Sequence, residues 1–339
     1  MGEPCVLPFL WQKEEELPLK FRKRHLLFCI LALIVLFMWL NNTNLFANKS
    51  GTYCFLAHRG LGQTFDVSQV EWDTNTAEII DPPEHPYLEN TLESMQVAFD
   101  CGAQCVELDI QRTKDNLLAV FHDSDLQMRT NGAGSVSDWT MEELKRLDIG
   151  YGYTADGGQT YPFRGKGVGL MPEFSEVLAA FPDKELLIHL RDGDLKTAEV
   201  LWQYLQDLPE SRLWQITVYG DEAGLQYLRE HNGEIRVLSA SRLKSALLQY
   251  ELLGWTGYIP QEIQNMELHI PLRYAKFLWG WPTKFVERMA SVNTKVVLVA
   301  GSGKWSEGFD TLQSLDAIPS GYTGYVWTNR IDKVNPSPA

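Results

Sequence analysis

The chain has 339 residues, which is enough for one large domain or two smaller ones. Hydrophobic residues make up 45% of it, and its 11 Trp and 15 Phe favour a packed core over disorder. The formal net charge of −14 argues against a nucleic-acid partner, which usually requires a basic surface.

The five cysteines are too few for a disulfide scaffold. Cys101 and Cys105 have no second Cys or His pair at zinc-site spacing, so the sequence does not indicate a zinc site. A Cys54–Cys105 disulfide would require the strands that carry these residues to be neighbours. We expect buried, reduced thiols.

The N-terminal region has the layout of a membrane anchor. A polar tail, residues 1–25, ends in a basic cluster, and an uninterrupted apolar run follows at residues 26–40. This run is shorter than the roughly 20 residues of a full span, although apolar residues up to Ala47 can extend it. The positive-inside rule then places the tail in the cytosol and the rest of the chain outside. We expect a single-pass signal anchor, with a cleaved signal peptide as the alternative.

Strand-like and helix-like segments alternate through the remaining chain. Strands are expected at residues 53–57, 105–110, 117–121, 185–190, 215–219, 235–240, 266–270, 296–300 and 325–328. Helices are expected at residues 92–101, 141–147, 173–180, 195–208, 222–231, 241–253 and 284–291.

About eight β/α units predict an α/β fold, namely one (β/α)8 TIM barrel over residues 53–335 with a loop insertion at 62–86. One strand candidate is surplus, and residues 266–270 have the weakest strand signal. A doubly wound open sheet is the alternative, but no Gly-x-Gly-x-x-Gly follows the first strand.

The segment from Cys105 to Asp123 reads as a strand, a tight turn and a second strand. Alternation places Glu107 and Asp109 on one face of the first strand. Two adjacent carboxylates in so apolar a strand repel each other and require a cation if they are buried. The alternative is an edge strand whose polar face meets water.

His58 and Arg59 follow the first expected strand, and His122 ends the third. Active sites of barrels lie at the C-terminal ends of the strands, so these residues should converge with Glu107 and Asp109 at one mouth. Taken singly, a histidine at a strand end is more often a structural hydrogen-bonding group.

Six motifs, in order and in register, resemble the glycerophosphodiester phosphodiesterase family. They are Ala57-His58-Arg59-Gly60, Glu89-Asn90-Thr91, Glu107-x-Asp109, His122-Asp123, Arg129-Thr130-Asn131-Gly132-x-Gly134 and Glu143-Leu144-x-x-Leu147. Residues 171–178 and 324–330 extend the resemblance more loosely. Taken alone, Glu89-Asn90-Thr91 could be no more than a helix start.

The resemblance implies a metal-dependent hydrolase that acts on phosphodiesters. Its metal ligands would be Glu89, Glu107 and Asp109, whose hard oxygen atoms suit Mg²⁺ or Ca²⁺. His58 and His122, on opposite sides of the metal, would serve as general base and general acid.

Arg59 would hold phosphate oxygens through its planar guanidinium. In the family the strand at residues 185–190 usually supplies Glu-x-Lys, whereas here His189 and Arg191 occupy those places. Arg191 keeps a cation for phosphate. His189 as a metal ligand would make Mn²⁺, Fe²⁺ or Zn²⁺ more favourable. Alternatively, Asp192 or Asp194 replaces the missing carboxylate, or the site is weakened.

Further departures lie on the substrate side of the mouth. Asn329 replaces the family's final Asp, and the segment at 297–303 lacks the usual Trp-Thr-x-Asn-like ending. The acidic insertion at 62–86 is either a lid or specificity loop or a surface decoration. The Trp-rich segment at 279–282 either packs in the core or contacts an acyl chain or membrane.

Three hypotheses follow for the function. The first is a membrane-anchored phosphodiesterase that hydrolyses glycerophosphodiesters or lysophospholipids outside the cytosol. The second is a non-catalytic relative that binds a phosphorylated headgroup. The third is a phospholipase-type lyase that releases a cyclic phosphate.

Overall fold

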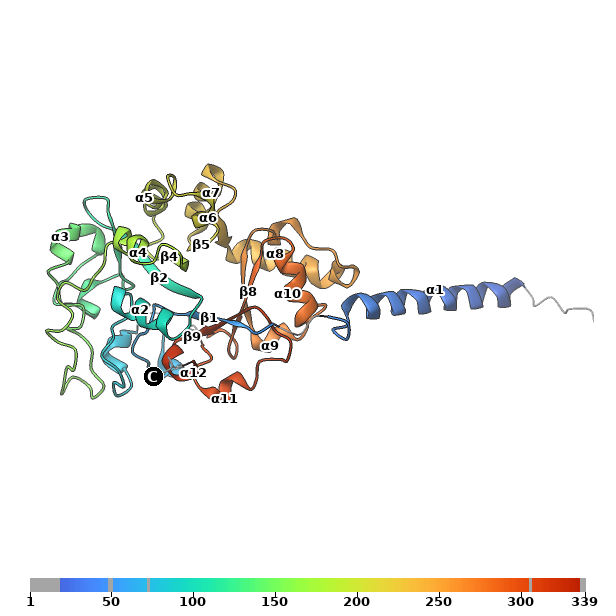
Figure 1. Ribbon diagram of the computed structural model, residues 1–339, viewed down its shortest axis with the longest axis horizontal. Coiled ribbons are helices and arrows are strands. Elements are labelled where there is room, and N and C mark those ends of the chain that lie inside the picture. The colour runs from blue at the N-terminus through green and yellow to red at the C-terminus, as the bar shows by residue number, and fades with distance from the viewer. Residues whose placement is uncertain (1–18, 48–50, 72–73, 305–306, 336–339) are drawn as a thin grey trace, which may run out of the picture.

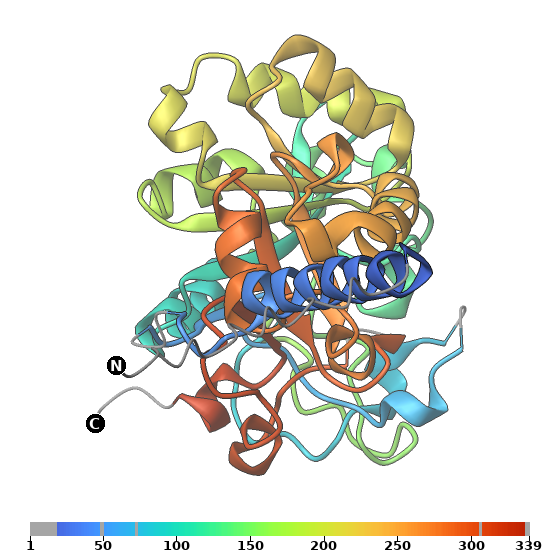
Figure 2. The ribbon, with the colours of Figure 1, turned by 90° about the vertical axis from the view of Figure 1, so that its right-hand side faces the viewer.

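The computed structural model describes residues 19–47, 51–71, 74–304 and 307–335, so most of the predicted cytosolic tail lies outside the described residues (Figure 1). Helix α1, Leu19–Asn42, projects from one end of the globular part (Figures 1 and 2). Within the described residues, α1 alone is long and apolar enough to cross a membrane, with a mean hydropathy of 2.0 over Lys23–Asn42 and none of that window buried. A signal sequence shares these features.

Eight parallel strands form the centre of the globular part. They are β1 Cys54–Ala57, β2 Cys105–Arg112, β4 Glu185–Leu190, β5 Ile216–Gly220, β6 Arg236–Leu238, β7 Glu267–Pro271, β8 Lys295–Val299 and β9 Tyr325–Thr328. Their order is β6-β5-β4-β2-β1-β9-β8-β7. An isolated parallel bridge between Val237 and Met266 joins the two ends of this order. The predicted (β/α)8 barrel is confirmed.

The sequence predicted one strand more than the barrel contains, and the candidate with the weakest signal was not the extra one. The weakest candidate, residues 266–270, corresponds to β7, which pairs with β8 over five residues from Glu267 to Pro271. The extra strand is β3, Leu118–Val120, which runs antiparallel to the far end of β2 and lies outside the barrel order. A short apolar run has the same composition in either setting, so periodicity alone does not distinguish the two.

Helices lie outside the barrel strands and connect them (Figure 1). The longer ones are α2 Leu92–Asp100, α4 Phe174–Ala180, α5 Leu195–Leu205, α7 Glu222–His231, α8 Ala240–Leu253 and α10 Thr283–Ala290. Shorter ones are α3 Met141–Leu144, α6 Glu210–Leu213, α9 Leu272–Ala275, α11 Leu312–Leu315 and α12 Ile331–Val334. All seven predicted helices are present, with ends shifted by a few residues.

The alternation predicted for β2 is confirmed by its packing. Val106, Leu108 and Ile110 are fully buried in the hydrophobic layer between the barrel and its helices. Glu107 and Asp109 have no exposed surface either, and they contact polar groups inside the barrel. The edge-strand alternative is therefore wrong.

The insertion at 62–86 is packed against the body of the protein. It contains two 3-10 turns, Val67–Gln69 and Thr76–Ile79, and a bridge between Phe65 and Ile80. Ala77 and Ile80 belong to a second hydrophobic cluster, which also includes Leu126 and Tyr153. This cluster joins the insertion to the segment that follows β3.

The described cysteines are all free. β1 and β2 are neighbours, as a Cys54–Cys105 disulfide would require, but the register pairs Cys105 with Leu56. Cys54 is therefore displaced along the sheet by two residues.

Candidate active site

His58 and Arg59 are placed by a tight turn at the end of β1. Arg59 has a φ of 54° and Gly60 a φ of 76°, the left-handed region that favours glycine. A Cβ atom on Gly60 would lie 2.7 Å from Ser94 Oγ and 2.8 Å from the backbone nitrogen of Met95. The close approach of this turn to α2 therefore requires Gly60, and it directs His58 and Arg59 into the mouth.

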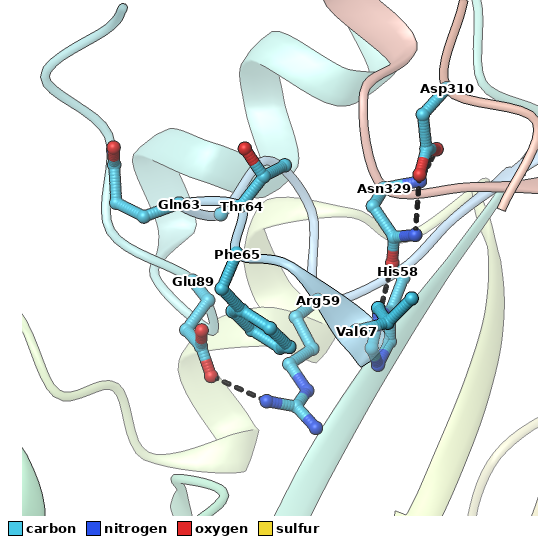
Figure 3. A pocket seen from close by; sticks show the side chains of 10 residues that line it. His58, Arg59, Gln63, Thr64, Phe65, Val67, Glu89, Asp310 and Asn329 are labelled. Carbon is cyan, nitrogen blue, oxygen red and sulfur yellow. Dashed lines mark hydrogen bonds and ion pairs between the residues drawn. The ribbon is translucent and has the colours of Figure 1, made fainter. Parts of the chain in front are cut away.

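Arg59 lies among the three carboxylates that the family resemblance proposes as metal ligands. Its Nη1 donates a 2.7 Å hydrogen bond to Glu89 Oε1, and its Nε forms a 3.1 Å ion pair with Asp109 Oδ2 that lacks hydrogen-bond geometry. Its backbone N–H donates to Glu107 Oε2 at 3.1 Å. The Arg59 side chain thus neutralises Glu89 and Asp109 in this arrangement. Figure 3 shows its bond to Glu89.

Asn90 also holds Asp109, at the same carboxylate oxygen that Arg59 approaches. Its Nδ2 donates to Asp109 Oδ2 at 2.9 Å, and its Oδ1 accepts the backbone N–H of Asp109 at 3.1 Å. Asn90 has a φ of 58°, which asparagine tolerates better than most residues. The motif does begin a helix, because Thr91 caps α2, but Asn90 also orients a carboxylate of the site.

Glu107, Asp109 and His189 form a cluster that could hold a metal ion, with ligand atoms within 4.8 Å of one another. Asp109 and His189 are register partners on β2 and β4, and His189 Nδ1–H donates to Asp109 Oδ1 at 2.7 Å. Glu89 lies on the other side of Arg59 and also pairs with Arg129 at 3.3 Å. The structure therefore brings three of the four proposed ligands together and keeps Glu89 with two arginines.

The electrostatics of this cluster favour a cation. Burial and the neighbouring Asp109 raise the pKa of Glu107 to about 8, because Arg59 offsets them only in part. Burial also acts to raise the pKa of Asp109, but Arg59, His122 and His189 lower it well below its ordinary value. A divalent cation would supply the positive charge that Glu107 lacks, so the donor set of two carboxylates and one imidazole fits such an ion.

His58 is held in one tautomer by a chain of hydrogen bonds. Asn329 Nδ2 donates to Asp310 Oδ2 at 2.9 Å, which leaves Asn329 Oδ1 to accept from His58 Nδ1 at 2.6 Å (Figure 3). Burial and Arg59 lower the pKa of His58 to about 3, so the ring is neutral at pH 7. Its Nε2 then carries a lone pair and lies 3.8 Å from Glu107 Oε2.

His122 reaches the mouth by a route that the sequence did not predict, since β3 is not a barrel strand. β3 runs back along β2, and the backbone N–H of Phe121 donates to the Asp109 carbonyl at 3.0 Å, which brings His122 to the level of Asp109. His122 Nδ1–H donates to Asp123 Oδ1 at 2.7 Å, and Asp123 accepts in turn from Arg129 Nε.

Burial and Arg59 lower the pKa of His122, whereas Asp109 and Asp123 act to raise it. What distinguishes His122 is its direct partner, because its Nδ1–H donates to the Asp123 carboxylate. His58 instead donates its direct hydrogen bond to the oxygen of a neutral amide, Asn329. This difference separates the two histidines chemically.

Arg191 follows β4, and its Nε donates to the His122 carbonyl at 3.0 Å. The alternative ligands Asp192 and Asp194 are engaged elsewhere. Asp192 accepts from the Thr197 hydroxyl at 2.5 Å, and Asp194 caps α5 and pairs with Arg112 at 3.2 Å. Neither belongs to the carboxylate–histidine cluster.

A cavity opens beside this cluster, between the barrel mouth and the insertion (Figure 3). It is lined by His58, Arg59, Gly62, Gln63, Thr64, Phe65, Val67, Glu89, Asp310 and Asn329. Half of these residues come from the first part of the insertion, which therefore forms one wall of the cavity.

Sequence reasoning missed the supporting residues Tyr219 and Asp310. The Tyr219 hydroxyl donates to Glu107 Oε1 at 2.7 Å, and Asp310 orients Asn329 as described above. Tyr219 could have been found as a polar residue at the end of a predicted strand. No sequence pattern singled out Asp310.

The fold and the site together define a class of protein, a (β/α)8 barrel with a carboxylate–histidine cluster at its C-terminal mouth. The model of the glycerophosphoryl diester phosphodiesterase family matches residues 58–297, and the chain belongs to that family. The members of the family are phosphoric diester hydrolases.

Curated relatives and solved structures agree with this assignment. A glycerophosphodiester phosphodiesterase of Caldanaerobacter subterraneus subsp. tengcongensis is 32% identical over 153 residues, which is 45% of this chain and 52% of that protein. Lysophospholipase D GDPD1 of Rattus norvegicus is 26% identical over 196 residues, 54% of this chain and 57% of that protein. The chain thus spans about half the length of these relatives.

Among the solved structures, the glycerophosphodiester phosphodiesterase of Agrobacterium tumefaciens has a TM-score of 0.54 at 19% identity, covering 84% of this chain and 99% of its own. The Oleispira antarctica phosphodiesterase, in complex with the product sn-glycerol-3-phosphate, has a TM-score of 0.51 at 19% identity, covering 84% of this chain and 96% of its own. At this identity the likeness establishes the fold.

Proposed function

We propose that this protein is a metal-dependent phosphodiesterase that hydrolyses glycerophosphodiesters or lysophospholipids to an alcohol and a glycerol 3-phosphate-type product. The observation that carries the proposal is the placement of two differently supported histidines, His58 and His122, beside the cluster of Glu107, Asp109 and His189. The substrate class follows the names of the relatives and the product held by the Oleispira enzyme.

Glu107, Asp109 and His189 would hold the divalent ion, with Glu89 as a further candidate once Arg59 turns to substrate. When bound, the ion would polarise a phosphoryl oxygen and neutralise charge that builds up at phosphorus. Mg²⁺ or Ca²⁺ suits the carboxylates, and His189 adds Mn²⁺, Fe²⁺ and Zn²⁺ as candidates.

The two histidines divide the proton transfers. Neutral His58 accepts a proton at Nε2 from the attacking water, whose oxygen bonds to phosphorus. His122, whose Nδ1–H donates to Asp123, would donate a proton from Nε2 to the departing alcohol oxygen as its bond to phosphorus breaks. The guanidinium groups of Arg59 and Arg191 would bind the phosphate oxygens.

We propose further that α1 is an uncleaved single-pass anchor, with the N-terminus in the cytosol and the barrel outside. The packing of its C-terminal end on the barrel domain supports an anchor over a signal that is removed. Asn41 and Asn42 each donate to the Trp255 carbonyl at 2.9 Å, and Arg288 donates to the Asn41 carbonyl at 2.8 Å.

The test is to incubate the full-length protein with glycerophosphocholine and lysophosphatidylcholine after chelation and with Mg²⁺, Ca²⁺, Mn²⁺, Fe²⁺ or Zn²⁺ restored in turn. Phosphorus NMR identifies the product. Hydrolysis that requires metal and is lost in both His58→Ala and His122→Ala would support the proposal. Full activity after exhaustive chelation would contradict it. A cyclic phosphate product would indicate lyase chemistry, and binding without turnover would indicate a headgroup-binding module.

A further inference from the structure

An apolar groove lies between α8 and α9, outside the cavity that holds His58. Its volume is about 270 Å³, just below the usual range of small-molecule sites, so it has room for part of a hydrocarbon chain rather than a whole lipid. It is lined by Leu247, Glu251, His269, Ile270, Pro271, Tyr274, Phe277 and Leu278. Six of these eight side chains are apolar or aromatic, so the groove suits a hydrocarbon chain.

Exposed apolar residues surround this groove. We define the α8–α9 patch as Leu248, Leu252, Leu253, Tyr258, Tyr274 and Phe277. We leave aside α1 and residues 45–46, which are apolar and exposed. Among the other described residues, more than half of the exposed large hydrophobic side chains belong to this patch. Leu252 is 65% exposed and Phe277 is 62% exposed. Such a concentration of apolar side chains usually marks a binding surface.

The position of α1 shows what this patch faces. α8, α9 and α1 meet at the same end of the globular part (Figure 1). Phe37 of α1 packs edge-on against Trp255, two residues after α8, with ring centroids 6.5 Å apart. Phe37 lies five residues before the end of α1 at Asn42. It is therefore roughly 7 Å farther along the helix axis from the globular part. If α1 spans a bilayer, Trp255 lies at the depth of the headgroups and the patch beside it lies on the same surface.

Arg288 fixes this arrangement. Its Nη1 donates to Asn42 Oδ1 at 3.0 Å, to the Gly254 carbonyl at 3.1 Å and to the Tyr250 hydroxyl at 3.1 Å. One guanidinium therefore connects the end of α1 with the end of α8. The Trp279 ring is part of the same support, because its Nε1–H donates to the Glu251 carbonyl at 2.8 Å. Of the two alternatives for this segment, the Trp279 side chain takes the first, because it packs against the core.

Two basic residues lie beside exposed aromatic rings at this surface. Although the net charge of the chain is −14, Arg273 precedes Tyr274 on α9, and Lys276 precedes Phe277 directly after it. The Arg273 guanidinium lies 5.7 Å from the Tyr274 ring centre and the Lys276 ammonium 5.2 Å from the Phe277 ring centre. Basic side chains beside exposed aromatic rings are the combination found at the interface of anionic membranes.

The groove lies close to the candidate active site. His269 lines the groove and contacts the Trp327 ring, with centroids 5.3 Å apart. Trp327 in turn contacts the His58 ring, with centroids 4.7 Å apart. Two ring contacts therefore separate the groove wall from the proposed general base. A lipid whose phosphate lies at the barrel mouth could place its acyl chain over β7 into the groove.

We propose that the α8–α9 patch rests on the bilayer that α1 spans, and that the groove receives the acyl chain of a single-chain phosphodiester lipid drawn from that bilayer. This inference rests on the proposed function and narrows its substrate class to a lysophospholipid. Glycerophosphodiesters without an acyl chain would use the mouth alone.

The first experiment needs no turnover. Full-length protein is reconstituted in vesicles of phosphatidylcholine and phosphatidylglycerol, with lysophosphatidylcholine carrying a diazirine on its acyl chain. After illumination, peptide mass spectrometry locates the adducts. The inference expects adducts on residues of the groove, and their loss in Phe277→Glu and Tyr274→Glu but not in Phe277→Trp. Adducts confined to α1, or unchanged in Phe277→Glu, would overturn it.

The second experiment compares kcat/KM for lysophosphatidylcholine in vesicles with kcat/KM for soluble glycerophosphocholine. Phe277→Glu should lower the ratio of the two by about tenfold, because a carboxylate opposes burial of the chain. Val168→Glu is the matched control, since Val168 is 57% exposed and belongs to the connection between α3 and α4, at the end opposite α1 (Figure 1). An unchanged ratio in Phe277→Glu would contradict the inference. If the wild type turned over neither substrate, the proposed function would be wrong. The adducts of the first experiment would still show whether the groove binds the acyl chain.

Discussion

The imidazole of His189 lies flat on the phenol ring of Tyr219, with ring centroids 4.1 Å apart and 5° between the planes. The Tyr219 hydroxyl also donates to Glu107, so one side chain positions two members of the carboxylate–histidine cluster. The family resemblance implied a glutamate at this position, and the histidine that occupies it has its own support. His189 is built into the site by stacking as well as by its bond to Asp109.

Two substitutions at Tyr219 separate these contributions. Tyr219→Phe removes only the hydrogen bond to Glu107, whereas Tyr219→Leu also removes the stacking on His189. We expect metal affinity to fall about tenfold in the first variant and about a hundredfold in the second, the range found when supporting groups of metal ligands are lost. Titration of metal binding by calorimetry checks the order, and thermal melts control for folding. Equal affinities in all three proteins would contradict the role of Tyr219.

Metal preference should depend on His189. A nitrogen ligand favours Mn²⁺, Fe²⁺ or Zn²⁺, whereas a third carboxylate favours Ca²⁺ or Mg²⁺. We expect His189→Glu to move the order of activation toward Ca²⁺ and Mg²⁺, measured as the metal concentration that gives half-maximal activity. His189→Gln supplies an oxygen donor, as His189→Glu does, but carries no charge. It therefore distinguishes the effect of charge from that of the donor atom. The prediction fails if the wild type and His189→Glu rank the metals identically.

The tautomer of His58 should depend on Asn329. Asn329→Leu removes the acceptor for Nδ1–H, and we expect kcat to fall about 100-fold or more, the contribution of a positioned general base. Asn329→Asp keeps an acceptor and adds a negative charge. Because the wild-type pKa of His58 is about 3, that charge should raise it and move the acidic limb of the pH–rate profile to higher pH. An unshifted limb in Asn329→Asp would argue that His58 is not the base.

The buried pair of Asp123 and Arg129 should make stability depend on acidity. Arg129 and His122 hold the pKa of Asp123 well below its ordinary value, against the effect of burial. The stability that this shift contributes is complete above the ordinary Asp pKa of about 3.9 and is lost as pH falls toward the lowered pKa.

Asp123→Asn leaves the Arg129 charge without this partner and should lower the free energy of unfolding at pH 7 by about 3 kcal/mol. The difference from wild type should stay constant down to about pH 4 and shrink below it, because Asp123 in the unfolded wild-type chain then becomes protonated while folded Asp123 is still ionised. Urea unfolding at several pH values measures this. Asp125→Asn is a suitable control, since Asp125 belongs to the same connection but its bonds are exposed. A difference that grew on acidification would contradict the sign.

Several features of the protein followed from the sequence alone. Alternation in β2 determined that Glu107 and Asp109 share a face, because successive side chains of any strand point to opposite sides. The eight β/α units and the apolar run of α1 were readable for the same reason, since local periodicity and length specify them. The order of the motifs was enough to predict the family.

Only the tertiary structure decided which groups support those residues. Asp310 and Tyr219 come from strands and loops far along the chain from His58 and Glu107, and no local pattern encodes their contact. The place of β3 outside the barrel order is of the same kind, because a short apolar run has the same composition inside or outside a barrel. The mouth collects side chains from successive barrel strands, so the identity of each neighbour depends on closure of the barrel, a property of the whole chain.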